Sequence, residues 1–130
     1  MKLAVLDYGI GNLRSAQKAF EHVGADARLT ADLAEIDAAD AVVLPGVGAF
    51  GACVDALDAS GLGEAALSVI AEGRPFMGIC VGMQLLYASS DEDPTHRGLA
   101  VFDRDIHLLP ADVKRPQMQW NRLVVAPGAE

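Results

Sequence analysis

A cysteine flanked by small residues, Gly78-Ile79-Cys80-Val81-Gly82, is the part of this sequence best suited to chemistry. It follows a short apolar run and precedes a helical pattern, so we expect a strand to end at Ile79, a turn at Cys80 and a helix to begin at Val81. Glycine on each side lets the backbone turn sharply and lets another segment approach closely. The free N–H groups of a helix start favour negative charge, which a thiolate carries. The pattern therefore predicts a nucleophilic cysteine.

A thiol nucleophile also needs hydrogen-bond donors that hold the oxyanion formed on the attacked carbonyl. The N–H of Val81 directly follows the thiol, and the loop Pro45-Gly46-Val47-Gly48 offers another donor from Val47 or Gly48. We expect these groups to form an oxyanion hole. Two simpler interpretations stay open here: the loop is a tight turn only, and Cys80 is a small apolar core residue, as most unpaired cysteines are.

A general base for the thiol is not evident among the three histidines. His22 lies near the end of an expected helix, where it suits a solvated partner of the last carbonyl groups. His96 belongs to an acidic loop and is expected at the surface, and His107 alternates with apolar residues in an expected strand. None is followed by a carboxylate at a spacing that would orient it, so the sequence assigns no base.

Short apolar runs alternate with helical patterns along the first ninety residues, while residues 30–40 are polar with scattered alanine and leucine. The alternation predicts an α/β fold in which helices cover both faces of a parallel sheet. Ligands of such sheets bind at the carboxyl ends of the strands, where the loops at residues 8–12, 45–50 and 79–82 are expected to meet. The expected strands are residues 2–7, 27–29, 41–44 and 75–79, and the expected helices are residues 13–23, 49–60, 62–72 and 81–88.

The pattern changes after Ser90. An acidic surface loop at residues 91–94 precedes two short expected strands, residues 99–102 and 105–109, which suit a hairpin. An irregular segment then leads to a last expected strand at residues 123–126. We expect residues 1–130 to belong to a single domain.

Composition narrows the classes of function. The formal charge of −8 argues against nucleic acid and against an anionic membrane surface, because phosphate binding rests on Lys and Arg. No apolar run reaches the ~18 residues of a membrane span, and no signal peptide is visible. The two cysteines, Cys53 and Cys80, do not suit a disulfide framework and favour a reducing compartment. We therefore expect a cytoplasmic protein.

The loop that contains Gly9 and Gly11 follows the first expected strand and opens a helix, as a dinucleotide-binding loop does. The third glycine of that motif is absent, and Arg14 in its place would prevent close packing of helix on strand. A flavodoxin-like phosphate binder therefore remains only as a third interpretation of the chain. No cluster of His, Cys or Asp has the spacing of metal ligands, so neither a metal nor a cofactor is expected.

Together the motifs resemble those of class I glutamine amidotransferases. The run Gly78-Ile79-Cys80-Val81-Gly82-Met83-Gln84 is similar to the family's G-x-C-x-G-x-Q signature, and Pro45-Gly46-Val47-Gly48-Ala49-Phe50 is similar to its oxyanion strand. More narrowly, Asp7-Tyr8-Gly9-Ile10-Gly11-Asn12-Leu13 and Pro116-x-Met118-x-Trp120-Asn121 resemble the glutaminase subunits of imidazole glycerol phosphate synthase. The motifs occur in the family's order and span nearly all of the chain.

The resemblance implies a flavodoxin-like α/β fold and a glutaminase reaction without a cofactor. Cys80 would attack the side-chain amide of glutamine, giving a glutamyl thioester and ammonia. Gln84 would help to hold the glutamine substrate. The backbone donors of the oxyanion hole would come from Gly46, Val47, Gly48 and Val81.

The resemblance also implies a partner, the cyclase subunit of imidazole glycerol phosphate synthase, which is a (β/α)₈ barrel of histidine biosynthesis. Ammonia would pass to this partner, which makes imidazole glycerol phosphate and an aminoimidazole carboxamide ribotide. Ordinary core packing is the alternative for Trp120. The residues implied to face the cyclase are Gly9, Gly11, Asn12, Trp120 and Asn121.

Two departures from the family pattern bear on activity. Gln119 stands where this subunit usually has glycine, which alters that loop or its docking. The family's catalytic His and Glu occur in a His-Pro-Glu run beyond the Trp-Asn motif, and this sequence contains no such run. We therefore expect a truncated chain, the N-terminal portion of the domain, with little or no glutaminase activity alone. A non-catalytic binding or scaffold module of the same fold is the alternative.

Overall fold

Four apolar segments form the main sheet, as the sequence predicts. They are β1 (Lys2–Leu6), β2 (Asp26–Thr30), β3 (Ala41–Gly46) and β4 (Phe76–Cys80). In the computed structural model, which describes residues 1–128, these strands are all parallel and lie in the order β2-β1-β3-β4. Strand β3 is buried along its whole length, which explains its continuous run of apolar residues.

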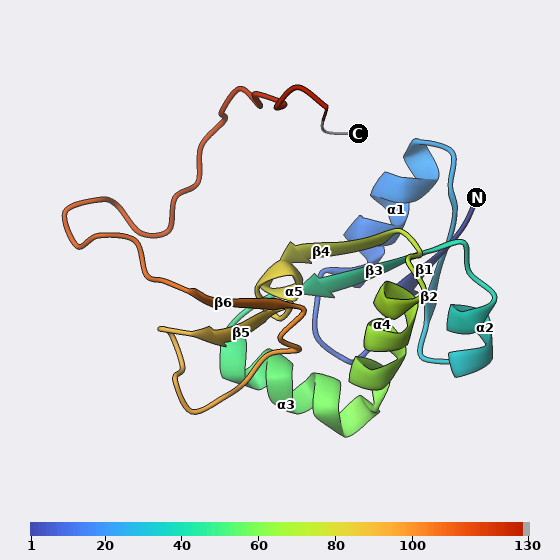
Figure 1. Cartoon of the computed structure of the whole chain (residues 1–130). Helices are drawn as coiled ribbons and strands as arrows, with labels where there is room; N and C mark the ends of the chain where they lie inside the picture. Colours follow the sequence, from blue (N-terminus) through green and yellow to red (C-terminus); the bar gives the residue numbers. More distant parts are fainter. Residues whose placement is uncertain (129–130) are drawn as a thin grey trace.

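Helices cover both faces of this sheet, so the predicted α/β architecture is confirmed (Figure 1). The helices are α1 (Leu13–His22), α2 (Leu33–Asp37), α3 (Phe50–Ser60), α4 (Leu62–Ala71) and α5 (Val81–Gln84). Helix α1 packs through Ala16 and Phe20 against one face, while α2, α3 and α4 cover the other. Gly61 separates α3 from α4 with a φ of 71°, as expected from a glycine between two helical patterns.

Alternating residues of β1 supply two separate cores. Leu3 and Val5 face α1, whereas Ala4 and Leu6 face the layer of α2, α3 and α4. Successive side chains of a strand point to opposite faces, so a sheet with helices on both faces needs apolar residues throughout. The second core includes Phe50, whose complete burial contributes about 1.5–3 kcal/mol. This anchor holds the start of α3 beside the loop that ends β3.

A short helix occupies part of the polar segment at residues 30–40. Helix α2 begins after Asp32, whose carboxylate accepts a hydrogen bond from the N–H of Ala34 at 2.8 Å. Such a cap stabilises a helix start by about 1 kcal/mol. Ile36 is the buried residue of this helix. One buried residue gives no helical period, so the sequence pattern did not predict α2.

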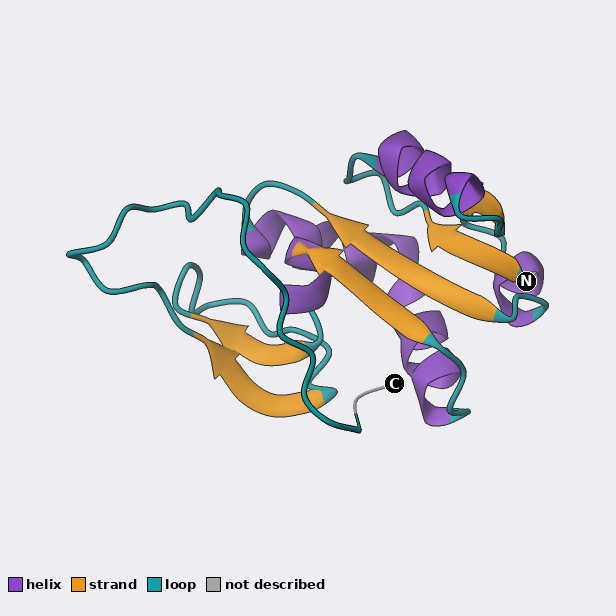
Figure 2. Ribbon diagram, turned by 90° about the horizontal axis from the view of Figure 1, so that it is seen from above, coloured by secondary structure: helices purple, strands orange, loops and turns teal. Residues whose placement is uncertain are grey.

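The helix expected over residues 81–88 is wrong beyond its first turn. Helix α5 ends at Gln84, and a strand, β5 (Tyr87–Ser90), follows it and pairs in parallel with β6 (Phe102–Ile106). The hairpin expected between residues 99–102 and 105–109 is therefore also wrong. The rings of Tyr87 and Phe102 pack with centroids 5.2 Å apart, and such cross-strand aromatic pairs stabilise a sheet. Figure 2 shows this small sheet beside the main one.

Residues 107–128 form an exposed segment that extends away from the main sheet (Figure 1). The strand expected at residues 123–126 is wrong, because Leu123, Val124 and Val125 are exposed and belong to no strand. Apolar β-branched residues favour a strand only where neighbouring strands pack against them. Within the described residues, no helix has the length and apolar character needed to cross a membrane.

Candidate active site

Cys80 ends β4 in a backbone conformation that residues other than glycine rarely adopt. Its φ of 56° and ψ of −120° lie in a region where strain costs of order 1–3 kcal/mol. The thiol is free, the residue is exposed, and α5 starts at the next residue, Val81. An exposed side chain on a strained turn between strand and helix has the geometry of a nucleophile elbow.

The glycines beside Cys80 are required by close backbone contacts. A Cβ on Gly78 would lie 2.5 Å from the Cα of Met83, and a Cβ on Gly82 would overlap the carbonyl oxygen of Leu44. Backbone atoms in a packed interior cannot rotate aside as the end of a flexible side chain does. The close approach expected at these small residues is confirmed.

The loop that follows β3 lies directly beside Cys80. Gly46 and Cys80 are register partners of the parallel pair β3–β4, and a Cβ on Gly46 would lie 2.5 Å from the nitrogen of Gly82. Val47 and Gly48 continue this loop in exposed positions. The structure therefore places Gly46 and Val81 beside the predicted nucleophile, with Val47 and Gly48 following in the same loop, while the chemical role of all four as oxyanion donors stays a prediction.

Two buried side chains contact the carbonyl groups of this loop. The hydroxyl of Tyr8 donates to the carbonyl oxygen of Pro45 at 2.6 Å, and the thiol of Cys53 donates to that of Val47 at 3.3 Å. Burial, together with the neighbouring Cys53 thiol, raises the pKa of Tyr8 well above its usual value, so the hydroxyl keeps its proton. Sequence reasoning missed both contacts. The sequence did offer one indication that Cys53 is buried: it lies three residues after Phe50, on the same face of α3.

Gln84 lies four residues after Cys80, at the end of α5. Its side-chain oxygen is buried and has no hydrogen-bond partner in the part of the chain that the structure describes. A buried polar atom without a partner costs about 1–3 kcal/mol. A donor supplied by a bound molecule would remove that cost. Because this oxygen is buried, a bound molecule reaches it only if the side chain turns, and the substrate-holding role predicted for Gln84 stays a prediction.

No histidine within residues 1–128 forms a hydrogen bond or ion pair with Cys80. His22 is exposed at the end of α1, as expected. The expectation that His107 lies in a strand is wrong, because it follows the end of β6 and instead contacts Asp91 at 3.2 Å. The structure thus supplies no base to the site from these side chains.

His96 is partly exposed at the surface, as expected, and it also joins the acidic loop to α3. Its Nδ1 lies 2.8 Å from Asp93 Oδ2, and its Nε2 lies 3.1 Å from Asp55 Oδ1 on α3. The loop packs so closely on α3 that a Cβ on Gly51 would overlap the Asp93 carboxylate. Sequence spacing carries no signal for this cluster, because Asp55 and His96 are 41 positions apart.

The two partners of this cluster titrate in opposite directions. Desolvation alone would lower the pKa of His96, but the hydrogen bond and charge of Asp93, with those of Asp55, raise it above 6.5. The hydroxyl of Thr95 and then His96 lower the pKa of Asp93 below 3.8. The contribution of His96 to stability is therefore complete below pH 6.5 and lost as the pH rises through its raised pKa. That of Asp93 is present above pH 3.8 and lost as the pH falls through its lowered pKa.

We expect His96→Gln to lower the melting temperature most near pH 5 and progressively less toward pH 8. Thermal unfolding followed by circular dichroism across this range measures the difference from the parent chain. His22→Gln is the matched control, since it removes a histidine that forms no ion pair within residues 1–128. A His96→Gln effect that stays constant across the pH range contradicts an ion pair at this position.

The residues predicted to face a partner lie in two separate parts of the molecule. The loop of Gly9, Gly11 and Asn12 adjoins the candidate site, since a Cβ on Gly11 would lie 3.4 Å from the Cβ of Pro45. Trp120 and its neighbour Asn121 belong to the exposed segment, and Trp120 is fully exposed. Core packing of Trp120 is therefore wrong, and the partner-facing role stays a prediction.

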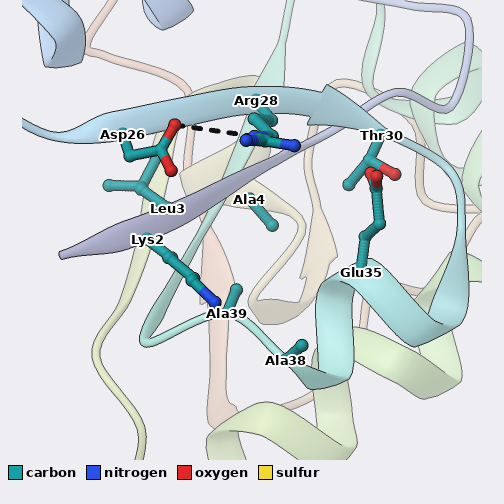
Figure 3. Close-up of a pocket in the computed structure, with 9 residues that line it drawn as sticks. All are labelled: Lys2, Leu3, Ala4, Asp26, Arg28, Thr30, Glu35, Ala38 and Ala39. Atoms are coloured by element: carbon teal, nitrogen blue, oxygen red, sulfur yellow. Dashed lines mark hydrogen bonds and ion pairs between the residues drawn. The ribbon is translucent and has the colours of Figure 1, made fainter.

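A cavity of about 160 Å³ lies away from this site, between the strands β1 and β2 and the segment that follows α2 (Figure 3). Its rim carries charges of both signs, and Arg28 lies 3.5 Å from Asp26. No residue of the Cys80 turn lines it. Its lining residues are Lys2, Leu3, Ala4, Asp26, Arg28, Thr30, Glu35, Ala38 and Ala39.

Comparison with known proteins places these motifs in one family. Residues 4–128 match the model of the glutamine amidotransferase class-I family. The chain is 46% identical over 128 residues to imidazole glycerol phosphate synthase subunit HisH of Syntrophotalea carbinolica, covering 93% of this chain and 62% of the relative. It is 44% identical over 128 residues to subunit HisH of Methanothermobacter thermautotrophicus, covering 98% of this chain and 64% of the relative.

A solved structure shares the fold. It is described as a crystal structure of glutamine amidotransferase and superposes with a TM-score of 0.68 at 20% identity, over 81% of this chain and 55% of that chain. The chain therefore spans less than two thirds of the length of the relatives quoted above. The match to residues 4–128 includes both the Cys80 turn and the loop beside it.

Proposed function

Because the chain belongs to the class I glutamine amidotransferase family, we propose that it is the glutaminase part of an imidazole glycerol phosphate synthase. The observation that carries this proposal is the strained, exposed Cys80, with Gly46 beside it in the sheet. The relatives' description as subunits of that synthase supports the choice of reaction. The two free cysteines fit a reducing compartment, and we propose a cytoplasmic location.

The proposed reaction begins with attack of the Cys80 sulfur on the side-chain amide carbon of glutamine. The C–S bond forms as the C=O electron pair moves to oxygen, and the N–H groups of Gly48 and Val81 stabilise that oxyanion. The oxyanion collapses, the C–N bond breaks, and the nitrogen leaves as ammonia after taking up a proton. Water then hydrolyses the glutamyl thioester to glutamate and restores the thiol. Gln84, four residues after the nucleophile, helps to hold the glutamine.

We propose that the ammonia passes to a cyclase subunit, a (β/α)₈ barrel that produces imidazole glycerol phosphate and an aminoimidazole carboxamide ribotide. The loop of Gly9, Gly11 and Asn12 supports a docking face there, because it adjoins the loop beside Cys80. The exposed Trp120 and Asn121 offer the second part of that face.

We also propose that residues 1–130 alone turn over little glutamine. The described histidines support this, since His96 and His107 contact carboxylates and none contacts Cys80. Without a base to take the thiol proton and return it to the leaving nitrogen, the reaction loses about 10²–10⁴-fold in rate. The same observation favours the alternative, a binding or scaffold module of this fold. A glutaminase assay with the cyclase present measures turnover, and near-normal turnover contradicts the proposal.

Labelling of Cys80 separates the enzyme from the scaffold. We expect a diazo-ketone analogue of glutamine to label Cys80 with saturable kinetics, faster than it labels glutathione, and glutamine to protect the thiol. Intact mass and peptide mapping identify the site, and Cys80→Ala is the control that should lose the label. We expect Gln84→Met to weaken saturation about tenfold, because one hydrogen bond to the substrate is lost. Labelling no faster than that of glutathione contradicts the enzyme and supports the scaffold.

A further inference from the structure

The loop beside Cys80 rests on two buried hydrogen-bond donors from different parts of the chain. Tyr8 follows β1, and its hydroxyl donates to the Pro45 carbonyl at 2.6 Å. Cys53 lies in the first full turn of α3, and its thiol donates to the Val47 carbonyl at 3.3 Å. Cys53 is fully buried and Tyr8 nearly so. The carbonyl groups of the loop therefore turn inward to protein donors instead of outward to water.

An inward carbonyl fixes the direction of the N–H group in the same peptide. The peptide bond is planar and trans, so its C=O and N–H groups point in opposite directions. The carbonyl of Val47 and the N–H of Gly48 belong to one peptide. Because the Cys53 thiol holds that carbonyl toward the core, the N–H of Gly48 points away from the core, to the exposed side of the loop. Val47, Gly48 and Cys80 are all exposed, and Gly46 of the same loop is the register partner of Cys80.

The loop has few other constraints at this peptide. Gly48 has a φ of 86° and nothing lies within 4 Å of a Cβ built on it, so neighbouring side chains do not restrict it. Glycine populates positive and negative φ about equally, which makes reorientation of the adjoining peptide easy. A buried donor under the Val47 carbonyl removes that freedom, because a reoriented carbonyl would leave the thiol without its acceptor.

We infer that Cys53 is a positioning residue, whose thiol sets the Val47–Gly48 peptide so that the Gly48 N–H serves the oxyanion formed at Cys80. Tyr8 has the same effect two peptides earlier, on the Pro45–Gly46 peptide. The inference rests on the proposed function, because the oxyanion belongs to that reaction. It gives Cys53, which performs no chemistry itself, a part in the rate of the step at Cys80.

The test compares a variant that keeps a donor with one that removes it, in the full 130-residue chain. Cys53→Ser retains a small donor and Cys53→Ala does not. The first readout is the ratio of two labelling rates of Cys80, that of the diazo-ketone analogue of glutamine over that of iodoacetamide. In labelling by the diazo-ketone, the thiol adds to the ketone and an oxyanion develops; the sulfur then moves to the adjacent carbon as that carbon takes up a proton and N₂ leaves. Substitution at the saturated carbon of iodoacetamide expels iodide and develops no oxyanion. We expect Cys53→Ala to lower the ratio about tenfold or more, and Cys53→Ser to keep it within about twofold.

The matched control is Val54→Ala, which removes buried volume from the next position of α3 without removing a donor to the loop. We expect it to leave the labelling ratio unchanged. If Val54→Ala lowers the ratio as much as Cys53→Ala does, general loosening of α3 explains the effect and the inference is overturned.

The second readout does not depend on the reactivity of Cys80. In isotopically labelled protein, the carbonyl carbon resonance of Val47 reports its hydrogen bond. We expect Cys53→Ala to move this resonance by more than the scatter of the other loop carbonyls, and Cys53→Ser to move it in the opposite direction because a hydroxyl is the stronger donor. If Cys53→Ala does not fold, the Val47 resonance in Cys53→Ser is sufficient: a shift supports the hydrogen bond, and no shift contradicts it. Resonances unchanged by either variant overturn the inference.

These readouts separate the inference from the proposed function. If the glutamine analogue labels Cys80 of the parent chain no faster than it labels glutathione, the proposed function is wrong. The carbonyl carbon resonance of Val47 then still shows whether Cys53 positions the Val47–Gly48 peptide. If labelling is rapid but the ratio is the same in the Ala and Ser variants, the proposed function stands and the role of Cys53 is wrong.

Discussion

Replacing Gly82 with alanine is expected to lower the free energy of unfolding by about 3 kcal/mol or more. The new Cβ would overlap the carbonyl oxygen of Leu44, and relief requires separating α5 from the end of β3. The same movement would carry Gly46 away from Cys80, its register partner. Urea unfolding followed by circular dichroism measures the loss of stability.

Gly63→Ala is the matched control for this substitution. Gly63 is also buried and helical, but a Cβ there would meet its nearest neighbour, the Cδ2 of Leu99, at an ordinary 3.5 Å. Alanine favours a helix over glycine by up to about 1 kcal/mol, so we expect a neutral or stabilising change. If Gly82→Ala lowers the free energy of unfolding no more than Gly63→Ala does, the start of α5 does not pack tightly against the end of β3.

Replacing Cys80 with glycine is expected to make the chain unreactive and more stable at once. Glycine adopts a φ of 56° and ψ of −120° without the strain of order 1–3 kcal/mol that a side chain bears there. It also loses about 0.5–1 kcal/mol more conformational entropy on folding. The net expectation is a gain of about 1 kcal/mol over a variant that keeps the Cβ. Labelling at position 80 should disappear.

Cys80→Ala is that reference variant, because it removes the thiol and retains the strained Cβ. Urea unfolding of the two variants under one set of conditions gives the difference in unfolding free energy. Equal stability of the Gly and Ala variants would mean that the turn carries no strain at Cys80. A stabilised, unreactive Gly variant would indicate that stability is given up here to expose the thiol.

The main sheet was predictable because its signals are local. Strand β3 is buried throughout and reads as one apolar run, and Gly61 marks the boundary between α3 and α4 with its positive φ. The helix expected beyond Gln84 failed because short apolar runs fit a helix and a strand equally well. Residues 87–90 form a strand because they pair with β6, where Tyr87 packs against Phe102. Phe102 lies beyond a loop in the sequence, so the local pattern around Gln84 carries no signal of this pairing.

The candidate site was predictable as far as its motif extends. The glycines around Cys80 predict a tight turn from their own spacing, and the structure has that turn. The donors under the neighbouring loop were not predictable, because Tyr8 and Cys53 reach the carbonyls of Pro45 and Val47 only once β1, β3 and α3 are packed together. Every residue carries a backbone carbonyl group, so the type of the accepting residue does not indicate whether its carbonyl accepts a hydrogen bond.

The position of β4 at the edge of the main sheet has a consequence for association. All segments of the candidate site lie within residues 8–84, and β4 has no partner beyond β3 in the part of the chain that the structure describes. The free N–H and C=O groups of an edge strand are a template for pairing with another strand. We therefore expect any further strand that joins this sheet, from this chain or another, to pair with β4 or with β2 at the opposite edge, and pairing at β4 would place that strand beside Cys80.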